Sequence, residues 1–171
     1  QKMVSNRKNT IWIAVFLIGL LIIPLGYSLD KSREDIGADI INNFGITGRY
    51  NTICLIDDGV DYTHPNLGSC TLSQISSGQC PTIIAATDLA DNDNDPFPEG
   101  GQEHGTQIAG IILSNHSKYR GIAPNSKIAF VRVFNYNFVT EESESNTSLI
   151  LDAIQWCINN KNSYNISAIS M

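Results

Sequence analysis

The chain has 171 residues, of which 42% are hydrophobic and 16% charged, and this composition excludes an intrinsically disordered protein. Beyond residue 23, eight basic residues stand against 17 acidic ones, and this net charge of −9 argues against a nucleic-acid partner. An acidic body of this length fits one domain of an exported protein that handles neutral or basic partners.

The first 28 residues have the features of a targeting segment rather than of a folded domain. Three basic residues precede an uninterrupted apolar run over residues 11–23, which a proline ends and small residues follow. This run is short of the roughly 20 residues that span a bilayer, although residues 11–29 together could form an uncleaved anchor. We expect a cleaved signal peptide in preference to an anchor, and a body, residues 29–171, that is secreted or membrane-anchored outside the cytoplasm.

The rest of the chain alternates between helix-like and strand-like patterns. Short apolar runs bounded by turn signals predict four strands: Thr52–Ile56, Pro81–Thr87, Lys127–Phe134 and Asn165–Met171. Apolar residues at helical spacing predict three helices: Glu34–Phe44, His104–Leu113 and Thr147–Asn160. Residues 135–146 are expected to form a loop that is acidic in its second half. The alternation predicts an α/β fold, a parallel sheet with helices on both faces.

The four cysteines stand in two kinds of context. Cys70 and Cys80 bracket a loop rich in Ser, Gly and Gln, and we expect them to pair because export permits disulfides. Cys54 lies within an apolar strand and Cys157 within a helical pattern, where we expect small core residues rather than ligands. No spacing of Cys and His suggests a zinc site.

The loop before His104 carries alternating carboxylates at Asp91, Asp93 and Asp95. Alternating hard oxygen donors are typical of calcium loops. The EF-hand pattern fails, however, because Pro96 stands where that pattern needs a glycine. Two interpretations stay open: a solvated surface loop, which we favour, and a structural calcium site.

Asp57 and His104 are candidates for a catalytic pair, although an isolated Asp and His seldom meet in a fold. Asp57 ends the first apolar strand, and open α/β sheets place chemistry at the carboxyl ends of their strands. His104 opens a helix 47 positions later, and a carboxylate that accepts from its Nδ1–H would fix the tautomer and stabilise the imidazolium. By itself, Asp57 could equally begin a simple Asp-Asp-Gly turn. The other histidines, His64 and His116, lie in turn-like settings, where we expect structural roles or exposure.

Longer motifs around both residues resemble a known family. I-D-D-G-V-D-Y-T-H-P-N-L resembles the aspartate motif of the subtilisin-like serine proteases (subtilases), and E-H-G-T-Q-I-A-G resembles their histidine motif. The resemblance covers roughly residues 36–171, in the family's order. It implies a subtilisin-like fold and a serine endopeptidase that cleaves proteins or peptides, with Asp57 as the catalytic aspartate and His104 as the general base. Ser170 and Met171 match the start of the segment that lines the family's substrate pocket.

The family pattern is not complete in this sequence. The nucleophile, in a Gly-Thr-Ser-x-Ala motif, and the oxyanion-hole asparagine have no counterpart in these 171 residues. Without them the mechanism lacks its covalent step and its largest electrostatic stabilisation. We therefore expect a truncated N-terminal portion of a peptidase domain that is inactive alone, with no cofactor required for catalysis. The alternative is a non-catalytic secreted or membrane-anchored binding module with the same fold.

Two features resemble the kexin-like branch, which prefers basic residues before the cleaved bond. Asp58 follows the aspartate, and D-N-D-N-D-P-F-P precedes the histidine motif. The acidic stretch Glu141–Glu144 would suit such substrates. Against this, the branch's H-G-T-R-C-A-G is H-G-T-Q-I-A-G here. Asp58 is accordingly either a specificity carboxylate or an ordinary turn aspartate.

Overall fold

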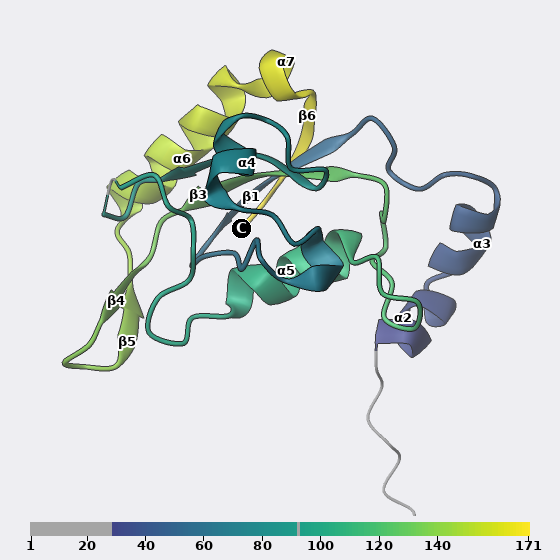
Figure 1. The fold of residues 1–171 in the computed structure, drawn as a ribbon, viewed down its shortest axis with the longest axis horizontal. Coiled ribbons are helices and arrows are strands. Elements are labelled where there is room, and N and C mark those ends of the chain that lie inside the picture. The colour runs from purple at the N-terminus through teal and green to yellow at the C-terminus, as the bar shows by residue number, and fades with distance from the viewer. Residues whose placement is uncertain (1–28, 92) are drawn as a thin grey trace, which may run out of the picture.

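The computed structural model describes residues 29–91 and 93–171. Its centre is a sheet of four parallel strands in the order β2-β3-β1-β6 (Figure 1). The strands of this sheet are β1 (Thr52–Asp57), β2 (Ile83–Asp88), β3 (Lys127–Arg132) and β6 (Ile166–Ser170). The described helices are α2 (Leu29–Asp35), α3 (Ala38–Asn43), η1 (Pro65–Leu67), α4 (Leu72–Ser76), α5 (His104–Leu113), α6 (Thr147–Asn159) and α7 (Lys161–Tyr164).

Helices cover both faces of the sheet, as the sequence predicts. Leu55 of β1 is buried in one cluster with Ala109 of α5, whereas its neighbour Cys54 is buried in a second cluster with Ala153 of α6. In Figure 1, α5 and α6 accordingly lie on opposite sides of the strands. Successive residues of a strand point to opposite faces, so the apolar run of β1 contributes side chains to the hydrophobic clusters on both faces of the sheet.

Two disulfides fasten the fold. Cys70 and Cys80 pair, as predicted, and close the loop that contains α4. Cys54 and Cys157 are buried core residues, as predicted, but they also form a disulfide, which was not predicted. Cys54 points to the face of β1 that α6 covers, and the two Cα atoms lie 5.9 Å apart, a separation that suits a disulfide.

The helix predicted over Glu34–Phe44 is instead two short helices, α2 and α3. Gly37 separates them in a left-handed conformation, with φ of 70°. The apolar side chains that define the amphipathic pattern, Ile36, Ile40, Ile41 and Phe44, are between 47% and 78% exposed. Among residues 29–91 and 93–171, no element covers this face, so an amphipathic pattern does not by itself bring burial.

The loop predicted over residues 135–146 contains a β-hairpin. Strands β4 (Asn135–Asn137) and β5 (Glu142–Glu144) pair antiparallel and project from the sheet (Figure 1). The hairpin contacts the segment before α5, because Nε2 of Gln102 donates to Oγ of Ser143 at 2.9 Å. It therefore lies beside the carboxyl ends of the strands.

Within the described part of the chain, no helix is long and apolar enough to cross a membrane. The signal peptide predicted over residues 1–28 lies outside the described residues. The alternative anchor over residues 11–29 also lies outside them, apart from Leu29.

Candidate active site

The fold brings Asp57 and His104 together at the carboxyl end of β1. Nδ1 of His104 lies 2.8 Å from Oδ1 and 3.0 Å from Oδ2 of Asp57. Asp57 is buried, whereas the side chain of His104 is 66% exposed. The hydrogen bond to Asp57 raises the pKa of His104, because the carboxylate stabilises the imidazolium. With Nδ1 held by Asp57, Nε2 is the atom left to accept a proton.

Two glycines permit close backbone contacts around the end of β1. A Cβ on Gly105 would lie 2.3 Å from the carbonyl oxygen of Gly59 and 3.0 Å from Cβ of Asp57. Gly59 itself has φ of 153°, and a Cβ there would lie 2.6 Å from Cα of Pro98. Gly105 therefore lets the start of α5 pack on the D-D-G turn, and Gly59 lets that turn pack against Pro98.

Asp58 is directed toward the start of α5. Its carboxylate accepts from the backbone amides of His104 at 3.3 Å and of Gly105 at 2.8 Å, and its side chain is largely buried. Burial raises the pKa of Asp58, and the hydrogen bond from Gly105 opposes that rise. The backbone amide of Asp58 donates to Oδ1 of Asp57 at 2.8 Å, so residue 58 contacts both partners of the pair.

A cavity of about 480 Å³ opens beside the pair. It is lined by Ile56, Asp57, Asp58, His104, Phe134, Ser143, Ile150 and Met171. Met171 thus lies at the same cavity as the pair, whereas Ser170 pairs with Leu55 at the end of β6 and does not line it. Substrate binding by Asp58, Ser170 and Met171 stays a prediction.

No serine of residues 29–91 and 93–171 forms a hydrogen bond with His104. Ser143 lines the cavity, but its Oγ accepts from Gln102. His64 and His116 lie elsewhere, and Nδ1 of each accepts from backbone amides of its own turn, as expected of structural histidines. The pair has no nucleophile to activate among the described residues.

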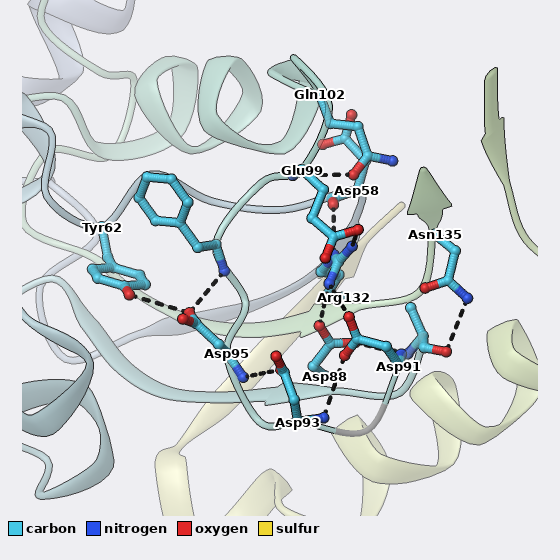
Figure 2. A network of polar contacts seen from close by, with 12 residues as sticks. Asp58, Tyr62, Asp88, Asp91, Asp93, Asp95, Glu99, Gln102, Arg132 and Asn135 are labelled. Carbon is cyan, nitrogen blue, oxygen red and sulfur yellow. Dashed lines mark hydrogen bonds and ion pairs between the residues drawn. The ribbon is translucent and has the colours of Figure 1, made fainter. Parts of the chain in front are cut away.

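A second charged cluster, which was not predicted from the sequence, surrounds Arg132 close to Asp58 (Figure 2). Arg132 ends β3 with 1% of its side chain exposed, opposite Asp57 of β1 and Asp88 of β2. Its Nη1 donates to Oδ2 of Asp88 at 2.6 Å and to Oδ2 of Asp91 at 3.0 Å. Its Nη2 forms an ion pair with Oε2 of Glu99 at 2.8 Å.

The Arg132 cluster, Arg132 with Asp88, Asp91 and Glu99, is buried around the guanidinium. Burial raises the pKa of Asp88, and the guanidinium opposes that rise. For Arg132, burial lowers the pKa, but the hydrogen bond and negative charge of Asp88, together with those of Glu99, outweigh burial and raise the pKa. A signal for the cluster was present in the sequence, because an arginine inside the apolar run K-I-A-F-V-R-V-F requires buried carboxylates.

The acidic loop places a different set of carboxylates together from the one predicted. Oxygens of Asp88, Asp91 and Asp93 lie within 4.8 Å of one another. Asp95 instead accepts from the hydroxyl of Tyr62 at 3.1 Å (Figure 2), and burial with this bond raises the pKa of Tyr62 to about 12. Carboxylate oxygens suit calcium, but Arg132 already bonds to two of the three carboxylates and supplies positive charge there.

The chain is similar to known proteins in sequence and in fold. The family model described as "Subtilase family" matches residues 48–170. Halolysin of Haloferax mediterranei is 34% identical over 134 residues, which cover 76% of this chain and 23% of halolysin. Neuroendocrine convertase 2 of Homo sapiens is 33% identical over 110 residues, which cover 60% of this chain and 16% of that protein.

A solved structure shows the same fold. The CspB protease of Clostridium perfringens superposes with a TM-score of 0.59 at 22% identity, over 78% of this chain and 31% of that one. The present chain thus spans less than a quarter of the two curated relatives named above and about a third of the solved protease.

Proposed function

Because this chain belongs to the subtilase family, we propose that it supplies the aspartate and the histidine of a serine endopeptidase. The nucleophilic serine and the oxyanion-hole asparagine would come from a segment other than these 171 residues. The observation that carries the proposal is the pairing of Asp57 and His104, with both carboxylate oxygens within 3.0 Å of Nδ1 and an exposed imidazole edge.

In this mechanism the serine hydroxyl attacks the peptide carbonyl, and Nε2 of His104 takes the hydroxyl proton. The same nitrogen then returns the proton to the leaving amine. Asp57 holds Nδ1–H, fixes the tautomer and stabilises the imidazolium, in keeping with the raised pKa of His104. No cofactor is required for these steps.

The proposed substrate is a protein or peptide that lies along the cavity beside the pair. The sequence predicts Asp58, Ser170 and Met171 as its contacts, and for Asp58 a structural role in the D-D-G turn is the alternative. Glu142 and Glu144 flank Ser143 on the exposed hairpin and would favour basic residues near this cavity. The acidic body gives no reason to expect nucleic acid as a partner.

We also propose that the protein works outside the cytoplasm. The two disulfides favour an oxidising compartment. A signal peptide over residues 1–28, or an anchor over residues 11–29, would deliver it there.

A non-catalytic binding module is the second candidate. The observation in its favour is that no described serine contacts His104. In such a protein the Asp57–His104 pair would persist without chemistry.

A fluorophosphonate probe applied to the full-length gene product separates these candidates, since the probe reacts only with an activated serine. We expect labelling of the wild type and none of His104→Ala. Asp152→Asn, which removes an exposed carboxylate on α6, is the matched control and should label like the wild type. An unlabelled wild type, or equal labelling of His104→Ala, would contradict the enzyme proposal.

A further inference from the structure

The start of α5 has no cap from its own sequence. The first amides of any helix lack partners within the helix, and a side chain just before it normally accepts from them. Glu103 stands at this position and makes no such hydrogen bond. The acceptor comes instead from another element, because the carboxylate of Asp58 accepts from the amides of His104 and Gly105.

The same residue is fixed on its backbone side. Nε of Arg132 donates to the carbonyl oxygen of Asp58 at 3.2 Å, and Figure 2 shows this bond next to the ion pairs of the guanidinium. The amide of Asp58 donates to Oδ1 of Asp57. Residue 58 is therefore held by the buried arginine while it contacts the carboxylate of the pair and the helix that carries the histidine.

We propose that Asp58 is a positioning residue that sets the distance and orientation of His104 relative to Asp57 by capping α5. It acts through His104 and not on the reacting atoms. This role differs from substrate specificity, because both carboxylate oxygens already accept from α5 and only 8% of the residue is exposed.

The capping carboxylate is also electrostatically favourable at this place. The amino end of a helix carries partial positive charge, so an anion there stabilises the first turn. Asp57 and Asp58 are the carboxylates that raise the pKa of His104. Loss of Asp58 would therefore change His104 in two ways, through charge and through position, and a test has to separate them.

Two substitutions make this separation. Asp58→Asn removes the charge but keeps a carbonyl oxygen that can accept from Gly105, whereas Asp58→Ala removes both. The full-length protein would be compared as wild type, both variants and Asp152→Asn as a control for an exposed carboxylate. Diethyl pyrocarbonate acylates the neutral imidazole, so its rate of reaction at His104 against pH, followed by mass spectrometry, reports the pKa without requiring enzyme activity.

We expect Asp58→Ala to shift the pKa of His104 further than Asp58→Asn does, because only the alanine variant leaves the first amides of α5 without an acceptor. In the kinetic measurement, which depends on the proposed function, kcat should fall about 100-fold in Asp58→Ala with KM nearly unchanged. Asp58→Asn should recover most of that loss. If Asp58→Ala does not fold, Asp58→Asn still decides. A pKa of His104 close to that of the wild type, with a kcat within about tenfold of the wild type, would support positioning by the retained acceptor.

Three results would overturn the proposal. The first is an identical His104 titration in the alanine and asparagine variants, which would leave only a charge effect. The second is a rise in KM for basic substrates with unchanged kcat, which would assign Asp58 to specificity. The third is an alanine variant that matches the wild type in both measurements. An inactive wild type would refute the proposed function, while the titration would still decide the role of Asp58.

Discussion

Asp57 and Asp88 both lie at the carboxyl ends of parallel strands. Asp57 bonds to His104 and Asp88 to Arg132, but the two pairs differ in exposure. Arg132 and Asp88 are both buried, at 2.6 Å from each other. His104 has 66% of its side chain exposed, while Asp57 is buried. The first pair is flanked by the carboxylates of Asp91 and Glu99, and the second leaves one imidazole nitrogen available.

The carboxyl ends of the strands of one sheet therefore hold both a fully buried ion pair and a pair with an exposed imidazole. A buried guanidinium cannot lose its proton or its partners without a large cost in free energy. An exposed imidazole exchanges its proton near neutral pH and loses little stability when it does so. Stability and chemistry should therefore respond to different substitutions.

The largest expected effect is that of Arg132→Met, which leaves buried carboxylates without a counter-charge. We expect the free energy of unfolding to fall by about 3–5 kcal/mol, measured by urea denaturation. Arg120→Met, at an exposed arginine, is the control and should change it by less than about 0.5 kcal/mol. A loss below about 1 kcal/mol in Arg132→Met would remove the distinction between the two pairs.

The disulfide between Cys54 and Cys157 comes next, because it fastens β1, the strand that carries Asp57 and pairs with β3. Replacing both cysteines by alanine should lower the free energy of unfolding by about 2–4 kcal/mol. The Cys70–Cys80 disulfide closes a separation of 10 residues rather than 103, so its double alanine variant should lose about 1–2 kcal/mol less. Equal losses in the two double variants would argue against this ranking.

His104→Gln tests the exposed pair and should lower stability by less than about 1 kcal/mol. The pKa of His104 in the folded protein lies above its ordinary value of 6.5. The bond between His104 and Asp57 therefore contributes fully to the free energy of unfolding below pH 6.5, and this contribution disappears as the pH rises through the folded-state pKa. Thermal melting of the variant and the wild type between pH 5 and 9 measures this. If the difference in melting temperature between the wild type and His104→Gln grew with rising pH, this prediction would be wrong.

The smallest effect concerns the calcium interpretation of Asp88, Asp91 and Asp93. Because Arg132 already compensates two of these carboxylates, removing calcium with a chelator should shift the melting temperature by less than about 1 °C. Lanthanum or calcium titration gives the complementary measurement. A rise of several degrees with calcium would show that the cluster holds an ion as well as the arginine.

The sequence is sufficient to predict the parallel sheet, which follows from short apolar runs that alternate with helical patterns. Local patterns place Asp57 at a strand end and His104 at a helix start, but they do not show that the two residues meet. Because β1 is buried and α5 returns to the same sheet, its strand end and the helix start meet. The prediction that Asp57 pairs with His104 came from the resemblance of their motifs to those of the subtilases.

Other features depend on how distant elements pack, and the sequence alone does not contain that information. The Cys54–Cys157 disulfide requires that α6 cover one particular face of β1. The capping of α5 by Asp58 requires that the helix start lie over the D-D-G turn. The face of α3 that carries Ile40 and Ile41 is exposed, although its helical pattern suggested burial. A helical pattern predicts burial only where another element packs against it.

We propose that Asp57 holds His104 as the base of a serine protease, and the titration of His104 measures this contact. The pH dependence of the His104 ring signals would be followed by NMR in the full-length protein and in Asp57→Asn. We expect the wild-type imidazole to titrate above 6.5, its ordinary value, and the Asp57→Asn imidazole to return toward that value. The same pKa in both proteins would contradict the claim.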